Sequence, residues 1–165
     1  MMNLRKTLVT VAFFGCVGCA VPAEEAVPFD PQVVEEEAME WMDSFVSSTR
    51  GGAATIEDFF ELLDDHPDFV FLFEGATIRS KAEVVGLGRE IFEPILSQTT
   101  DVQESSAVAL GADLAHAAIS GTFARTFKDG TSTEPAAFGF SVVLVRSPEG
   151  WKARFIHNSE AELEE

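Results

Sequence analysis

The first half of the chain carries apolar residues at the spacing of α-helices. Asp30-Pro31 places a capping residue before a proline, a pair that is typical of a helix start. The residues that follow divide into an apolar stripe and a glutamate-rich side, which predicts an amphipathic helix. The stripe consists of Val34, Ala38, Trp41, Met42, Phe45 and Val46. Gly51-Gly52 ends this helix, and a second, short helix opens at Thr55 and stops before Pro67.

A short strand and a third helix are expected next. Residues 69–73 form a continuous apolar run, which fits a buried strand. Ser80 and Glu83 then form a capping box, in which the two side chains satisfy N–H groups at the start of a helix. The apolar positions after this box predict a helix that continues to Leu96.

After Thr99 the apolar period changes from helical to alternating, so the rest of the chain is predicted to be β-structure. Strands are expected at about residues 101–110, 114–127, 136–147 and 151–158, with glycine-containing turns between them. Helices followed by consecutive strands predict an α+β domain, in which three N-terminal helices are wrapped by a curved antiparallel sheet.

The two faces of the predicted sheet differ in chemistry. Strand 114–127 places Ile119 and Phe123 on one face together with Arg125, and strand 136–147 continues this face with further Phe residues. We expect this face to cover the helices and to form the core or a pocket. The opposite face carries Ala, Ser, Thr and Val, which suits packing against another sheet. It therefore predicts a homodimer, with a solvated sheet face as the alternative.

The aromatic face also supplies candidate ligand contacts. A guanidinium among aromatic side chains is costly to bury unless a carboxylate or an anionic ligand pairs with it. Arg125 is such a residue, although it lies near a strand end from which it could reach solvent. The apolar candidates are large side chains that are predicted to face the helices. Together, the predicted ligand-binding residues are Trp41, Phe60, Phe71, Phe123, Arg125, Phe140 and Phe155.

Two titratable residues are candidates for acid/base chemistry. Alternation along the last strand places His157 on the same face as Trp151, Ala153 and Phe155, where an imidazole could exchange a proton near pH 7. The alternative is a structural histidine that is bonded to the backbone. Asp68 precedes the buried strand and could point into the mouth of a pocket, or it could accept backbone N–H groups in a turn.

The first residues have the pattern of a bacterial export signal. Arg5-Lys6 is followed by an apolar stretch that is too short for a spanning helix. This stretch ends in Cys16-Val17-Gly18-Cys19, which resembles a lipobox and makes Cys19 the predicted lipidation site. Simple secretion, with cleavage after Ala23, is the alternative. We therefore expect a signal peptide over 1–19, a tether over 20–30, one folded domain over 31–159 and an acidic tail over 160–165.

The composition of the chain excludes several classes of partner and of catalytic group. The formal net charge of −17 repels phosphate backbones, so nucleic acid is not an expected partner, and the domain should contact a membrane only through a lipid anchor. The chain has no Tyr, which excludes a phenolic donor or nucleophile. Its three His residues show no metal-ligand spacing and there is no glycine-rich phosphate loop, so no metal and no cofactor are predicted.

Several short motifs between residues 67 and 159 point to a family. They are Pro67-Asp68-Phe69, Ala107-Val108-Ala109-Leu110-Gly111, Lys128-Asp129-Gly130, and Gly150-Trp151-Lys152 followed by His157 and Ser159. This order resembles the NTF2-like superfamily, in particular its SnoaL-like and DUF4440-type domains and the association domain of calmodulin-dependent kinase II. The resemblance implies a cone-shaped α+β domain with a pocket between sheet and helices, commonly as a dimer. Members include isomerases, cyclases, dehydratases and binding or assembly domains, so the fold alone fixes no reaction.

These observations lead to one main hypothesis and two alternatives. The chain is expected to be an exported, lipid-anchored domain that binds a small, mostly apolar molecule in a Phe-lined pocket. One alternative is a SnoaL-like isomerase, cyclase or dehydratase that uses His157 or Asp68 as its acid/base. The other is a dimerisation or assembly domain of the cell envelope. At this point it stays open whether the protein is an enzyme.

Overall fold

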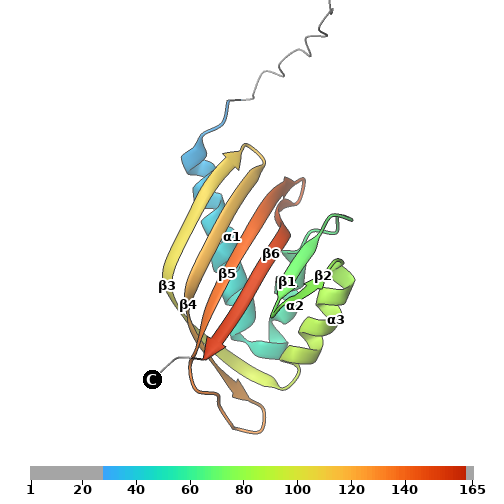
Figure 1. The fold of residues 1–165 in the computed structure, drawn as a ribbon, viewed down its shortest axis with the longest axis vertical. Coiled ribbons are helices and arrows are strands. Elements are labelled where there is room, and N and C mark those ends of the chain that lie inside the picture. The colour runs from blue at the N-terminus through green and yellow to red at the C-terminus, as the bar shows by residue number, and fades with distance from the viewer. Residues whose placement is uncertain (1–27, 163–165) are drawn as a thin grey trace, which may run out of the picture.

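Six strands form one curved sheet, and the long helix α1 runs along one of its faces (Figure 1). The computed structural model describes residues 28–162; the predicted signal peptide, Cys19 and most of the predicted tether lie outside these residues. The elements are α1 (Pro31–Arg50), the 3-10 helix η1 (Gly52–Ala54), α2 (Ile56–Glu61), β1 (Val70–Phe73), β2 (Ala76–Ile78), α3 (Lys81–Phe92), β3 (Ile95–Gly111), β4 (Leu114–Phe127), β5 (Ala136–Ser147) and β6 (Gly150–Glu162). Of the helices among the described residues, none is long and apolar enough to cross a membrane.

The sheet is largely antiparallel, and its strand order is β2-β1-β6-β5-β4-β3. Among the pairings of these six strands within residues 28–162, the one between β1 and β6 is parallel, and it joins the short N-terminal hairpin to the long C-terminal meander. The bounds of β4 and β5 are those that the alternation predicts. The α+β architecture expected from the sequence is therefore confirmed.

Both predicted helix caps are present. The Asp30 side chain accepts a hydrogen bond from the Gln32 N–H at 3.0 Å, and the Ser80 hydroxyl accepts one from the Glu83 N–H at 3.3 Å. Each cap satisfies an N–H group that has no partner inside its own helix. The start of α1 and the start of α3 are thus set locally by the sequence.

The boundary between α3 and β3 differs from expectation. α3 ends at Phe92 and not at Leu96, because Pro94 has no N–H to continue the helix. Ile95 and Leu96, which follow Pro94, begin β3, and Ile95 is 2% exposed and pairs with Phe127. β3 is therefore longer than the predicted strand 101–110, and the short strand β2 was not expected.

One hydrophobic core lies between the helices and the inner face of the sheet. β4 contributes the buried side chains of Ala115, Ala117 and Ile119, and β5 contributes Val142 and Leu144. The alternation that was predicted for these two strands is confirmed, with the apolar face turned toward the helices.

The predicted face assignment of β6 is wrong in its second half. The pairing with β5 shifts by one residue, because Ala153 pairs with Leu144 and Phe155 already pairs with Val143. Arg154 is the extra residue of this β-bulge, and a bulge of this kind reverses the alternation that follows it. Arg154 forms a short ion pair with Asp64.

After the bulge, Ile156 faces the core and is fully buried, whereas Phe155 and His157 are exposed on the outer face. β6 also runs on to Glu162, so Glu160 belongs to the sheet and not to a tail. Because alternate residues share a face, Asn158 and Glu160 lie on the inner side with Ile156.

Glu37 on α1 is hydrogen-bonded to two side chains of the sheet, Arg146 on β5 and Trp151 on β6. Arg146 donates a hydrogen bond to the Glu37 carboxylate at 2.5 Å, and the Trp151 indole N–H donates to the same oxygen at 3.0 Å. The Arg146 guanidinium also lies 4.3 Å from the centre of the Trp151 ring. These two donors hold the pKa of Glu37 below its usual value, with the Arg146 hydrogen bond as the larger cause.

Candidate functional site

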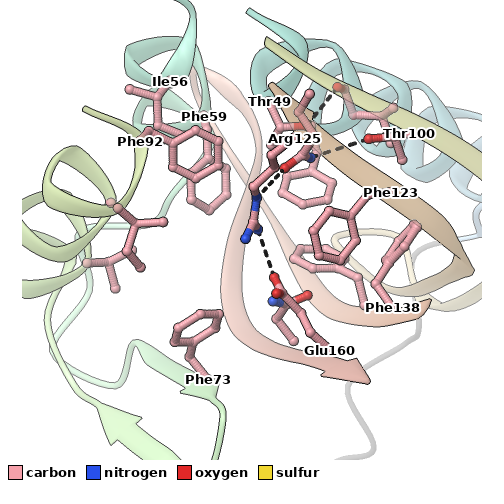
Figure 2. A pocket seen from close by; sticks show the side chains of 18 of the residues that line it. Thr49, Ile56, Phe59, Phe73, Phe92, Thr100, Phe123, Arg125, Phe138 and Glu160 are labelled. Atoms are coloured by element: carbon pink, nitrogen blue, oxygen red, sulfur yellow. Dashed lines mark hydrogen bonds and ion pairs between the residues drawn. The ribbon is translucent and has the colours of Figure 1, made fainter. Parts of the chain in front are cut away.

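An apolar cavity lies between the helices and the inner face of the sheet (Figure 2). It is bounded by the C-terminal part of α1, by α2, by α3, and by the ends of the strands that meet there. Its volume is about 100 Å³. Eight of its 21 lining residues are phenylalanines: Phe45, Phe59, Phe71, Phe73, Phe92, Phe123, Phe138 and Phe140.

The phenylalanine rings form packed walls rather than a loose surface. Phe45 from α1 stacks on Phe140 from β5 with their centroids 4.0 Å apart and their planes at 16°. Phe123 and Phe138 meet edge to face at 6.3 Å on the sheet side. Stacked and edge-to-face pairs are favourable arrangements for aromatic quadrupoles, so these rings define a fixed apolar slot.

A small polar cluster is built into the same cavity. The Arg125 guanidinium donates to Gln98 Oε1 at 3.0 Å and to Glu160 Oε1 at 2.9 Å, and the Gln98 amide donates to the Thr100 hydroxyl at 3.3 Å (Figure 2). Arg125 also lies 4.4 Å from the centre of the Phe123 ring, a cation–π contact. The expected carboxylate partner of Arg125 is therefore Glu160.

The Arg125–Glu160 ion pair is largely shielded from solvent. The two side chains are only 21% and 20% exposed. Charged groups at this depth interact more strongly with each other, and with any nearby ligand, than they would on an open surface. The pair therefore marks the polar position of an otherwise apolar cavity.

Four of the seven predicted ligand-binding residues line the cavity, namely Phe71, Phe123, Arg125 and Phe140. The other three do not. Trp41 is buried in the core behind the wall, where it stacks on Phe45 at 6.1 Å. Phe60 is also a core residue, and Phe155 lies on the outer face because of the bulge in β6.

Neither predicted catalytic residue reaches the cavity. His157 is exposed on the outer face of β6, on the side of the sheet opposite to the helices. Asp68 lies in an exposed turn, where its backbone N–H donates to His66 Nδ1 at 3.1 Å and its side chain is 82% exposed. An acid or base must lie within hydrogen-bond reach of its substrate, so the placement of these two residues gives their predicted role no support.

The sequence-based interpretation missed most of the polar cluster. Glu160 was assigned to an acidic tail, and Gln98 lies before the predicted start of its strand. The two-residue spacing of Ile156, Asn158 and Glu160 indicates that these residues share one face of the strand, and this would have placed Glu160 on the inner face. The spacing alone does not tell which face is the inner one, because that depends on the position of the bulge.

Within residues 28–162, no group of three or more His, Cys, Asp or Glu side chains is arranged to hold a metal ion.

Comparison with known proteins gives a consistent picture of the fold. A family model described as a SnoaL-like domain matches residues 39–162. No curated protein matches the chain.

Solved structures with the same fold come from several organisms. An NTF2-like superfamily protein from Salmonella enterica has a TM-score of 0.66 at 16% identity, covering 81% of this chain and 94% of that one. A protein from Streptomyces avermitilis that is proposed to be an NTF2-like dehydratase gives 0.67 at 15% identity, with coverages of 79% and 97%. The association domain of the C. elegans calmodulin-dependent kinase II gives 0.62 at 13% identity, with coverages of 78% and 97%. At these identities the structures confirm the NTF2-like fold and carry no function with them.

Proposed function

We propose that this chain, which belongs to the SnoaL-like domain family, binds a small, mostly apolar molecule in its Phe-lined cavity. The observation that supports this proposal is a slot walled by eight phenylalanines with one polar cluster inside it. Ligand sites are typically apolar and contain a few fixed polar groups that orient the ligand. A core that serves stability alone has no need for an open space, because side chains lose contacts around a void.

A cavity-filling variant tests this proposal. Leu87 on α3 lines the cavity, whereas Leu96 is 57% exposed and does not line it. Leu87→Trp should fill the slot, and Leu96→Trp is the matched control. Ligand-observed NMR with a set of small neutral aromatic molecules should give saturation-transfer signals for the wild type and for Leu96→Trp, and weak or no signals for Leu87→Trp. Equal signals from all three proteins would count against binding in the cavity.

Catalysis is a second candidate, and one observation favours it. Glu160 is a carboxylate inside the cavity, 2.9 Å from the Arg125 guanidinium. A SnoaL-like isomerase, cyclase or dehydratase reaction would therefore use Glu160 as its acid/base in place of His157 or Asp68. Turnover that survives in Glu160→Gln would contradict this assignment.

We also propose that the outer face of the sheet forms a homodimer. The register across four strands aligns Val108, His116, Val143 and Phe155 in one row on this face. Val108 and Phe155 are 49% and 36% exposed, although both side chains are large and apolar. Association domains among the similar structures give this proposal general support.

Export and lipidation at Cys19 remain proposals that rest on the N-terminal sequence. Cell fractionation of the full chain, together with metabolic labelling by a fatty acid, would test them. Labelled protein in the membrane fraction that is lost in Cys19→Ser is the expected result. Unlabelled wild-type protein in the soluble fraction would contradict it.

A further inference from the structure

The cavity contains one cation and one anion and is neutral as a whole. Among its lining residues, Arg125 and Glu160 are the charged side chains, and they are paired at 2.9 Å. A charged ligand would bring a second ion of one sign into a site with few other polar groups. A carboxylate on the ligand would face Glu160, and an ammonium would face Arg125. Since an unpaired ion is costly in apolar surroundings, the cavity favours an uncharged ligand.

The ion pair also fixes which polar group this uncharged ligand can carry. A guanidinium has five N–H donors and no acceptor, and an ionised carboxylate has acceptors alone. Arg125 uses two hydrogen bonds within the cluster, to Gln98 and to Glu160, so further N–H donors remain on the same group. A hydroxyl group both accepts and donates, and it can bridge the two side chains. A carbonyl can accept from Arg125 but has nothing to donate to Glu160.

The open volume sets the size of the ligand. The cavity volume of about 100 Å³ is less than the roughly 150 Å³ of a cavity that holds one benzene molecule in a protein core. It is also well below the roughly 300–1,000 Å³ of sites that take drug-sized ligands. Arg125 and Glu160 are 21% and 20% exposed, so the cavity reaches solvent at its polar end and a ligand can extend beyond the enclosed part. A single ring with one short substituent is therefore the largest ligand that we propose.

We propose that the ligand of this cavity is an uncharged single-ring molecule with one hydroxyl group, which accepts a hydrogen bond from Arg125 and donates one to Glu160. The inference rests on the proposed binding function and adds the chemical class of the ligand. The ring lies among the phenylalanines on either side of Arg125, several of which are seen in Figure 2.

Four probes that share one ring test this class directly. They are p-cresol, toluene, p-toluate and 4-methylbenzylamine, which carry a neutral hydroxyl, no polar group, an anion and a cation at pH 7. Isothermal titration of the full domain should show p-cresol binding at least about tenfold tighter than each of the other three. Binding of any one of the other three probes as tight as that of p-cresol overturns the inference but leaves the binding function in place. Binding of none of the four overturns both.

A substitution that neutralises Glu160 and keeps the size of its side chain gives an independent test. Glu160→Gln removes the anion and leaves Arg125 without a counter-ion, so the affinity for p-toluate should rise at least about tenfold while that for p-cresol falls. Glu104→Gln changes the net charge equally at an exposed position of β3, outside the cavity, and should leave both affinities unchanged. An unchanged preference for p-cresol over p-toluate in a folded Glu160→Gln protein overturns the inference.

Discussion

Arg125 is the residue on which the account of the site depends. Its place among phenylalanines follows from strand alternation, and physical chemistry requires a partner for a shielded guanidinium. The structure supplies that partner in Glu160, a residue 35 positions later in the chain. The need for a carboxylate was therefore predictable, but its identity depends on how β6 folds back against β5.

Removing one member of this ion pair should destabilise the domain. Arg125→Met leaves the carboxylate of Glu160, which is 20% exposed, without its counter-ion. We expect the free energy of unfolding to fall by about 1–3 kcal/mol in urea titrations. The double variant Arg125→Met/Glu160→Leu should recover most of this loss, because no ion is then left unpaired. If the double variant loses as much unfolding free energy as the two single variants lose in sum, the result would contradict the pairing.

The stability of the domain should also depend on pH through Glu37. Because Arg146 and Trp151 lower the pKa of Glu37, its carboxylate stabilises the folded state above its usual pKa of about 4.3, and this contribution is lost as the pH falls through the lower, folded pKa. Glu37→Gln should therefore reduce the unfolding free energy by about 1 kcal/mol at pH 7 and by much less near pH 3.

Glu40→Gln, at an exposed position of the same helix, is the control and should cost little at either pH. A Glu37→Gln deficit that stays constant from pH 7 to pH 3 would show that the carboxylate charge is not what stabilises this contact.

At the scale of elements, regular patterns were predictable and irregular ones were not. The bounds of β4 and β5 and the capped starts of α1 and α3 follow from alternation and from capping chemistry. The bulge at Arg154 does not, because one extra residue in a strand leaves no signature in an apolar pattern. Its consequence is large, since it turns Phe155 and His157 outward and brings Glu160 into the cavity.

The helix α3 forms one wall of the cavity, and its two glycines have different surroundings. A Cβ at Gly86 would meet nothing within 4 Å, whereas one at Gly88 would lie 2.7 Å from the ring of Phe60, which is 3% exposed. Gly86→Ala should therefore stabilise the domain by about 0.5–1 kcal/mol through helix propensity. Gly88→Ala should destabilise it, because a buried ring must shift. Thermal unfolding of the two variants compares them directly, and equal gains in Tm would refute the close contact at Gly88.

In the molecule as a whole, the inner face of the sheet encloses the cavity, and the outer face carries exposed apolar side chains although the net charge of the protein is −17. The row of Val108, His116, Val143 and Phe155 crosses four strands of the outer face, toward the end of the sheet where β3 turns into β4. The bulge strengthens the case for a dimer, since it adds Phe155 to a surface that the sequence alone predicted to be flat and lined by small residues. Aromatic side chains are enriched at protein interfaces.

A charged residue in this row should abolish the proposed dimer. Val108→Glu places a like charge near its own copy across the interface, whereas Val33→Glu changes a residue of similar exposure, 48%, on α1. Sedimentation velocity at micromolar concentration should show a dimer for the wild type and for Val33→Glu, and a monomer for Val108→Glu. A wild-type protein that sediments only as a monomer would refute the dimer.

The most direct test of the binding function is to locate a ligand in the protein. Crystals grown with 4-bromophenol, an uncharged single ring with a hydroxyl, would place the bromine by its anomalous scattering. We expect one strong anomalous peak within the cavity, with the phenol oxygen within hydrogen-bond distance of Arg125 and Glu160. An empty cavity, or bromine found only on the outer face of the sheet, would contradict it.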